Sequence, residues 1–120
     1  MVTNEQLTAA QQDCLEAAYL VASADGRARI TDIASELGTR LPTVVRNVAR
    51  LKQLKLVRQS EREPVELTPR GEELATQLAH RHRDLSQFLT AVLGVDPEVA
   101  DGEACMIEHG ISAATAMQLH

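Results

Sequence analysis

Aromatic side chains are nearly missing from this sequence of 120 residues, which contains no tryptophan, one tyrosine and one phenylalanine. A core without aromatic rings has to be built from leucine, valine, isoleucine and alanine, which favours helices that pack through small interfaces. The shortage also argues against a binding mode in which nucleic-acid bases stack on aromatic rings. We therefore expect a mainly α-helical fold.

Long apolar runs are also absent, and cysteine is scarce. The N-terminus has neither the basic start nor the apolar run of a secretory signal, so we expect a cytoplasmic protein with no membrane partner. In a reducing compartment, Cys14 and Cys105 are expected to be thiols rather than a disulfide. Each is then either a core residue or a metal ligand, and we interpret Cys14 as core.

Positive charge is concentrated in one part of an acidic chain. Residues 39–70 carry eight basic and three acidic side chains, a local charge of +5, which leaves −10 on the rest of the chain. Charge alone is compatible with a solvated surface. The asymmetry nevertheless suggests a basic surface for phosphates on a body whose carboxylates can hold cations.

The apolar spacing predicts a winged helix-turn-helix in residues 1–73. Helices are expected near residues 8–23, near 30–37 with Thr31 as N-cap, and from about Pro42 to Leu54, with the valines and leucines of this third helix on its buried side. Residues 56–59 and 65–67 are typical of two strands around a charged turn, which would form the wing.

Residues 74–120 are predicted to be helical as well. Thr68 and Pro69 mark the start of a long helix that can extend to Gly94, Asp96 and Pro97 repeat this pattern of cap and proline, and Ser112 can cap a last short helix. The fold class is therefore mainly α, with a two-stranded wing and a helical C-terminal region.

The third helix would enter the major groove of DNA with its polar side. Arginine recognises guanine, asparagine recognises adenine, and threonine can contact phosphate or a thymine methyl group. Its position between a turn and a wing favours the DNA-binding interpretation over an ordinary polar helix face. The predicted contact residues are Thr39, Arg40, Pro42, Thr43, Arg46, Asn47 and Arg50, with Arg62 on phosphate from the wing.

A second group of residues has the spacing of a metal site. Cys105, Glu108 and His109 stand at i, i+3 and i+4, so their side chains leave one helix on the same side. Asp13 and Glu16 on the first helix, and His82 on the long helix, are candidate further ligands. Taken singly, His82 is equally compatible with a core histidine, and the two carboxylates with a solvated face.

These motifs together resemble the family of the diphtheria-toxin repressor and the manganese-transport regulator. The resemblance runs from about Leu7 to the end of the chain and is most specific at 103–109, Glu-Ala-Cys-Met-Ile-Glu-His. It implies a homodimer that binds double-stranded operator DNA when Mn(II) or Fe(II) is bound, and that represses metal-uptake genes. It also implies that 74–120 is a metal-binding and dimerisation region that continues past His120.

By the same resemblance, the ligand set is a hybrid of the two branches of the family. Asp13 and Glu16 match the manganese-sensing branch, Cys105 matches the iron-sensing branch, and His82, Glu108 and His109 match both. Ser86 stands where the iron-sensing branch has a glutamate ligand of a second site, so we expect that second site to be weakened or lost.

Two other classes of protein fit the sequence less well. A winged-helix regulator of the multiple-antibiotic-resistance type, which senses a small apolar ligand, would leave the cysteine, glutamate and histidine of 105–109 without a role. A metallohydrolase needs an open metal position beside a general base, and no such base is evident. We therefore expect a regulator rather than an enzyme, with no small organic substrate.

Overall fold

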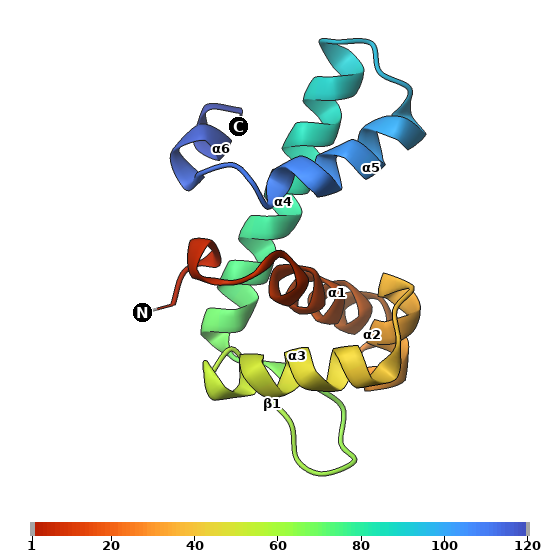
Figure 1. The fold of residues 1–120 in the computed structure, drawn as a ribbon, viewed down its shortest axis with the longest axis vertical. Coiled ribbons are helices and arrows are strands. Elements are labelled where there is room, and N and C mark those ends of the chain that lie inside the picture. The colour runs from red at the N-terminus through yellow and green to blue at the C-terminus, as the bar shows by residue number, and fades with distance from the viewer. Residues whose placement is uncertain (1, 120) are drawn as a thin grey trace. The chain divides into compact units, whose positions relative to one another are not determined.

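The computed structural model describes residues 2–119, and the mainly helical class with a two-stranded wing is confirmed (Figure 1). In chain order the elements are η1 (Asn4–Gln6), α1 (Ala9–Asp25), α2 (Ile30–Leu37), α3 (Leu41–Gln53), β1 (Val57–Arg58), β2 (Glu66–Leu67), α4 (Pro69–Ala91), α5 (Pro97–Glu108) and α6 (Ala113–Leu119). Among these residues, no helix is both long enough and apolar enough to cross a membrane.

The chain divides into two compact units, residues 1–76 and residues 77–120, so that α4 begins in the first unit and ends in the second. Each unit has its own apolar core. The core of the first unit includes Leu15, Ile33, Val44 and Leu51, and that of the second is centred on Leu85, Leu89, Ala100 and Ala104.

In the first unit, α1, α2 and α3 all contact one another. α1 begins with a capping box, in which Thr8 Oγ1 accepts the Gln11 N–H at 3.1 Å and Gln11 Oε1 accepts the Thr8 N–H at 3.0 Å. It ends at Gly26, whose φ of +79° is the left-handed conformation that glycine adopts without strain.

The start of α2 differs from the prediction. Arg29 is the N-cap residue and makes no side-chain cap bond, and Thr31 lies within the first turn of the helix, so its assignment as N-cap was wrong. The reason lies in the preceding residue, since the Ala28 carbonyl accepts the Val65 N–H at 2.8 Å in an isolated β-bridge. The extended conformation therefore ends at the bridge, and the helix follows immediately.

The wing is a short antiparallel hairpin whose loop extends away from the helices of the first unit (Figure 1). Val57 pairs with Leu67 and Arg58 with Glu66, so both strands are shorter than expected. Val65 bonds to the segment before α2 rather than to the first strand, which shortens the second strand and ties the hairpin to the helices.

A tight corner joins the hairpin to α4. Thr68 donates its N–H to the Leu56 carbonyl at 3.0 Å, and its hydroxyl donates to the Lys55 carbonyl at 2.8 Å and accepts the Gly71 N–H at 3.1 Å. A Cβ atom on Gly71 would stand 1.9 Å from the Leu56 carbonyl oxygen. In the Leu-Thr-Pro-x-Gly sequence, the backbone of Gly71 thus packs directly against the backbone of Leu56, at a distance that only glycine allows.

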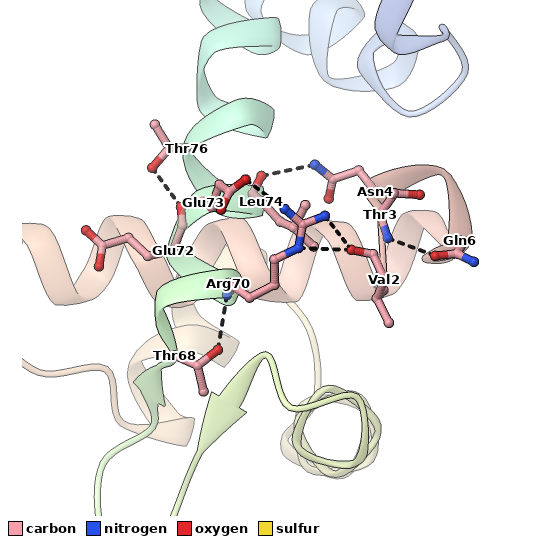
Figure 2. A network of polar contacts seen from close by, with 11 residues as sticks. Val2, Thr3, Asn4, Gln6, Thr68, Arg70, Glu72, Glu73, Leu74 and Thr76 are labelled. Atoms are coloured by element: carbon pink, nitrogen blue, oxygen red, sulfur yellow. Dashed lines mark hydrogen bonds and ion pairs between the residues drawn. The ribbon is translucent and has the colours of Figure 1, made fainter.

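The N-terminal segment is bound to the first turns of α4 (Figure 2). Arg70 donates from Nε and Nη2 to the Val2 carbonyl at 3.1 and 2.7 Å, and from Nη1 to Glu73 at 2.7 Å. Asn4, which is buried, donates its amide to the Leu74 carbonyl at 3.1 Å. These bonds fix the segment before α1.

The second unit contains the C-terminal part of α4 together with α5 and α6. Asp96 caps α5 by accepting the Glu98 N–H at 3.0 Å, with Pro97 in the first turn, and Ser112 accepts the Thr115 N–H at 3.2 Å at the start of α6. Both helices therefore begin where the sequence predicted. α4 ends three residues before Gly94, in a turn where the Val92 N–H still bonds to the Phe88 carbonyl at 2.9 Å.

Candidate metal centre and DNA-binding surface

The end of α5 brings three donors of different chemistry together. The thiol of Cys105, the carboxylate of Glu108 and the imidazole of His109 each offer one ligand atom, and these atoms lie within 4.8 Å of one another. Glu108 is the last residue of the helix, and His109 is its C-cap. His109 therefore lies just beyond the end of the helix, whereas the spacing predicted that all three donors are helical. The backbone at His109 is still α-helical, so the side chain keeps the direction that its spacing predicts.

A second imidazole approaches the same carboxylate from α4. His82 Nδ1 lies 3.3 Å from Glu108 Oε2, and His109 Nε2 lies 3.5 Å from Glu108 Oε1. Glu108 therefore lies between two histidines. On the opposite edge of its ring, His82 Nε2 is 2.7 Å from Asp101 Oδ1.

Burial makes Glu108 the most unusual of these residues, since its side chain is only 1% exposed. A carboxylate removed from water is strongly unfavourable unless cations or hydrogen-bond donors surround it. Two neutral imidazoles and a divalent ion would meet that requirement, and imidazole, carboxylate and thiolate are all ligands of first-row transition metals. The donor set of the second unit therefore fits a metal ion.

The two carboxylates expected from the first helix lie in the other unit. Asp13 and Glu16 are both half-buried on α1, one turn apart. Their part in the metal site stays a prediction. The neighbouring Cys14 is fully buried in the core of the first unit, as predicted, and burial followed by the charge of Asp13 raises the pKa of its thiol to about 11.

The predicted DNA contacts lie on one exposed side of the first unit. Val44, Val48 and Leu51 form the buried stripe of α3, whereas most of the predicted contact residues are exposed. Thr43 and Asn47 are half-buried beside this stripe. The exposed members are Thr39, Arg40, Pro42, Arg46 and Arg50.

The exposed side of α3 also carries apolar residues, and one of them was predicted to be buried. Val45 is 54% exposed, so the prediction that all valines and leucines of this helix lie on its buried side was wrong. Leu41, which precedes the predicted start of the helix, is 46% exposed. Val45 follows Val44 by about 100° around the helix, which takes it off the narrow stripe that contacts α1 and α2. The exposed side of α3 is thus part cationic and part apolar.

The wing presents further cations. Arg62 is exposed at the tip of the turn and has a φ of +64°, and the Glu63 N–H closes that turn on the Ser60 carbonyl at 3.0 Å. Lys52, on the last turn of α3, donates to the Gln59 carbonyl at 2.8 Å and so links the helix to the wing. Nothing in the sequence pattern indicated this contact.

Comparison with known proteins then decides the family. The domain described as "Iron dependent repressor, metal binding and dimerisation domain" matches residues 68–120. The HTH-type transcriptional regulator MntR of Lysinibacillus sphaericus is 34% identical over 105 residues, which cover 88% of this chain and 75% of that protein. The chain belongs to the DtxR/MntR family.

Other members of the DtxR/MntR family are longer than this chain. The transcriptional regulator MntR of Salmonella typhimurium is 41% identical over 90 residues, which cover 75% of this chain and 57% of that protein. A solved structure of the manganese regulator SloR superposes with a TM-score of 0.80 at 27% identity, over 91% of this chain and 51% of that one. The chain thus spans little more than half the length of these two relatives.

Membership of the DtxR/MntR family confirms the resemblance, and the matching relatives named above are described as transcriptional regulators. It separates the chain from the multiple-antibiotic-resistance type of regulator. One residue of the metal region was not found from the sequence, namely Asp101. It stands four residues before Cys105 on the same side of α5, so the spacing that identified the other donors also included it.

Proposed function

We propose that this protein is a metal-activated transcriptional regulator that binds operator DNA as a homodimer and represses metal-uptake genes. The observation that carries the proposal is the cluster on α5, in which Cys105, Glu108 and His109 direct three donor atoms to within 4.8 Å of one another beside His82. The same chain contains a winged helix whose exposed side is cationic.

The metal that we propose is Mn(II) or Fe(II). A bound divalent ion would offset the negative charge of the buried Glu108 carboxylate, which lies 3.3 Å from Nδ1 of His82 on α4. Asp13 and Glu16 remain proposed ligands on the strength of the family resemblance. Carboxylate oxygens suit manganese, whereas the thiolate of Cys105 favours softer ions, so this ligand set is suited to iron as well as to manganese.

Operator binding is proposed to depend on α3 and the wing. Arg46 and Arg50 on the exposed side of α3 are suited to base edges and phosphates, and Arg62 at the tip of the wing is suited to phosphate. Because the contacts are mainly cationic, affinity should fall steeply with salt, with a log–log slope of about −0.9 for each phosphate neutralised.

The second copy of the chain is proposed to bind at the second unit. This unit exposes several large apolar side chains, and the domain matched there is described as a dimerisation domain. The most exposed are Met106 and Met117 at 77%, Val92 at 66%, Leu93 at 60% and Val99 at 50%.

Metal titration of the metal-free protein, followed by DNA binding, tests the proposal. A preferred duplex is first selected from a randomised pool in the presence of Mn(II), and its affinity is then measured by fluorescence anisotropy at increasing Mn(II) or, without oxygen, Fe(II). We expect each metal to tighten binding. The variant His109→Ala should keep the circular dichroism of the folded protein and lose this response, because it removes one donor and leaves α3 intact.

A matched control is available on the same long helix. His80 is an exposed histidine of α4 outside the donor cluster, so His80→Ala should respond to metal like the wild type. Equal tightening of DNA binding by metal in the wild type and in His109→Ala would show that the site is assigned wrongly. If neither metal changed the DNA affinity of the wild type, the proposed function itself would be refuted.

A further inference from the structure

The ring of His82 lies between two carboxylates of α5. Its Nε2 atom is 2.7 Å from Asp101 Oδ1, and its Nδ1 atom is 3.3 Å from Glu108 Oε2. The two carboxylates differ sharply in environment, since the Asp101 side chain is 72% exposed and that of Glu108 is 1% exposed. The three residues belong to the second unit, and Asp101 has no role in the function proposed above.

We propose that Asp101 is a positioning residue of the metal site, which holds the ring of His82 so that Nδ1 faces the ion. This inference rests on the proposed function. A neutral imidazole carries one proton, and the nitrogen that carries it cannot be a metal ligand. When Asp101 accepts the Nε2–H, the proton is fixed on the outer edge of the ring, and the lone pair of Nδ1 is left on the side of Glu108.

The two distances distinguish this role from that of a ligand. Two atoms bound to one ion at about 2.1 Å each, with octahedral or tetrahedral angles, are separated by roughly 3.0–3.4 Å. The separation of 3.3 Å between His82 Nδ1 and Glu108 Oε2 fits a shared ion. The separation of 2.7 Å between Nε2 and Asp101 Oδ1 is too short for one, and is the length of a direct charge-assisted hydrogen bond.

An exposed ion pair that merely joins α4 to α5 is the simpler alternative. Such pairs contribute little to stability, typically about 0–1 kcal/mol, and would not govern metal binding. A hydrogen-bond partner on the outer nitrogen of a ligating histidine, by contrast, affects metal affinity about 10–100-fold. The two roles therefore predict different results for one substitution.

The experiment compares the full chain with three variants. Asp101→Ala removes the acceptor, Asp101→Asn retains an oxygen that can accept the same hydrogen bond, and Glu103→Ala removes one negative charge from an exposed position of the same helix. Mn(II) affinity and stoichiometry are measured by calorimetry and by the electron paramagnetic resonance signal of free Mn(II). The tautomer of His82 is read in the metal-free protein from the nitrogen-15 shifts of the ring.

We expect Asp101→Ala to weaken Mn(II) binding 10–100-fold and to lose the preference for the Nε2–H tautomer. Asp101→Asn should recover most of both properties, and Glu103→Ala should resemble the wild type in both. Unchanged affinity and tautomer in Asp101→Ala would overturn the proposal. So would a loss of one of two bound ions in that variant, because Asp101 would then be a ligand itself.

The failure of the proposed function gives a different result. If the wild-type protein bound no Mn(II) or Fe(II), the metal-dependent regulator would be excluded, and with it the metal-positioning role. The tautomer of His82 would then report only whether Asp101 orders the ring.

Discussion

Replacing Gly71 with alanine should destabilise the first unit, although alanine is the better helix former. Gly71 is the third residue of α4, and its Cβ atom would stand 1.9 Å from the Leu56 carbonyl oxygen and 2.9 Å from the carbonyl carbon. Leu56 cannot move away freely, because its side chain is buried and its carbonyl oxygen accepts the Thr68 N–H at 3.0 Å. The two backbone segments would have to separate by about 1 Å to reach even the shortest contact that atoms tolerate.

The magnitude follows from two opposing effects. Overpacking a tight contact costs about 1–3 kcal/mol and sometimes more, and a contact between two backbones cannot be relieved by a change of rotamer, which favours the upper end. The higher helix propensity of alanine offsets this by about 1 kcal/mol of stability. We therefore expect a net loss of about 2 kcal/mol, which corresponds to a Tm lower by roughly 8–16 °C for a unit of this size.

Gly102 provides the matched control, since it is helical and a Cβ atom there would meet nothing within 4 Å. Gly102→Ala should stabilise α5 by about 0.5–1 kcal/mol. Thermal and urea unfolding of both variants, followed by circular dichroism, measures the two effects. If Gly71→Ala were as stable as the wild type, the corner between the wing and α4 would be loose, and the steric argument for this glycine would fail.

Three further predictions concern the thiols and the DNA-facing helix. Burial, and then the charge of Asp13, raise the pKa of Cys14 from 9.0 to about 11. Between pH 9 and 11 the thiol therefore loses its proton in the unfolded chain but keeps it in the folded protein, so the free energy of unfolding is unaffected by this group below pH 9 and falls across this range. Between pH 9 and 11 the free energy of unfolding of the metal-free protein should fall by up to about 2.7 kcal/mol more than that of Cys14→Ala. If urea unfolding gave the same pH dependence for both proteins, this prediction would be contradicted. Arg46→Ala should cost about 1–3 kcal/mol at the preferred base and relax selectivity there, which an operator library measures; unchanged base preference would remove Arg46 from base recognition. Cys105→Glu should shift activation toward manganese relative to cobalt and abolish the thiolate-to-cobalt charge-transfer absorption of the wild type. An identical metal order, with no such absorption in either protein, would assign Cys105 to packing.

The local features of the fold were predictable because short-range chemistry determines them. Thr68 followed by Pro69, and Asp96 followed by Pro97, begin helices where the sequence indicated, since a cap and a proline act within one turn. The grouping of Cys105 with Glu108 and His109 was predictable for the same reason, because helical spacing alone brings their side chains to one side.

The features that the sequence missed depend on contacts between distant segments. Val45 is exposed because α1 and α2 cover only a narrow stripe of α3, and the width of that stripe is a property of the packing. Asp101 and His82 are 19 residues apart on different helices, so their hydrogen bond appears only when α5 packs against α4. The early start of α2 has a similar origin, in the bridge between Ala28 and Val65.

Two cationic residues of the first unit have a backbone conformation that is unfavourable for any residue with a side chain. Among the described residues, the two non-glycine positions with positive φ are Lys55, at +62°, and Arg62, at +64°. Each adopts a conformation that disfavours a side chain by about 1 kcal/mol or more, and glycine would adopt it without strain. A chain selected for stability alone would have glycine at both positions, between α3 and β1 and at the tip of the wing. Engineering for heat resistance that placed glycine there would therefore produce a more stable protein that has lost two cations, one of which is the proposed phosphate contact Arg62.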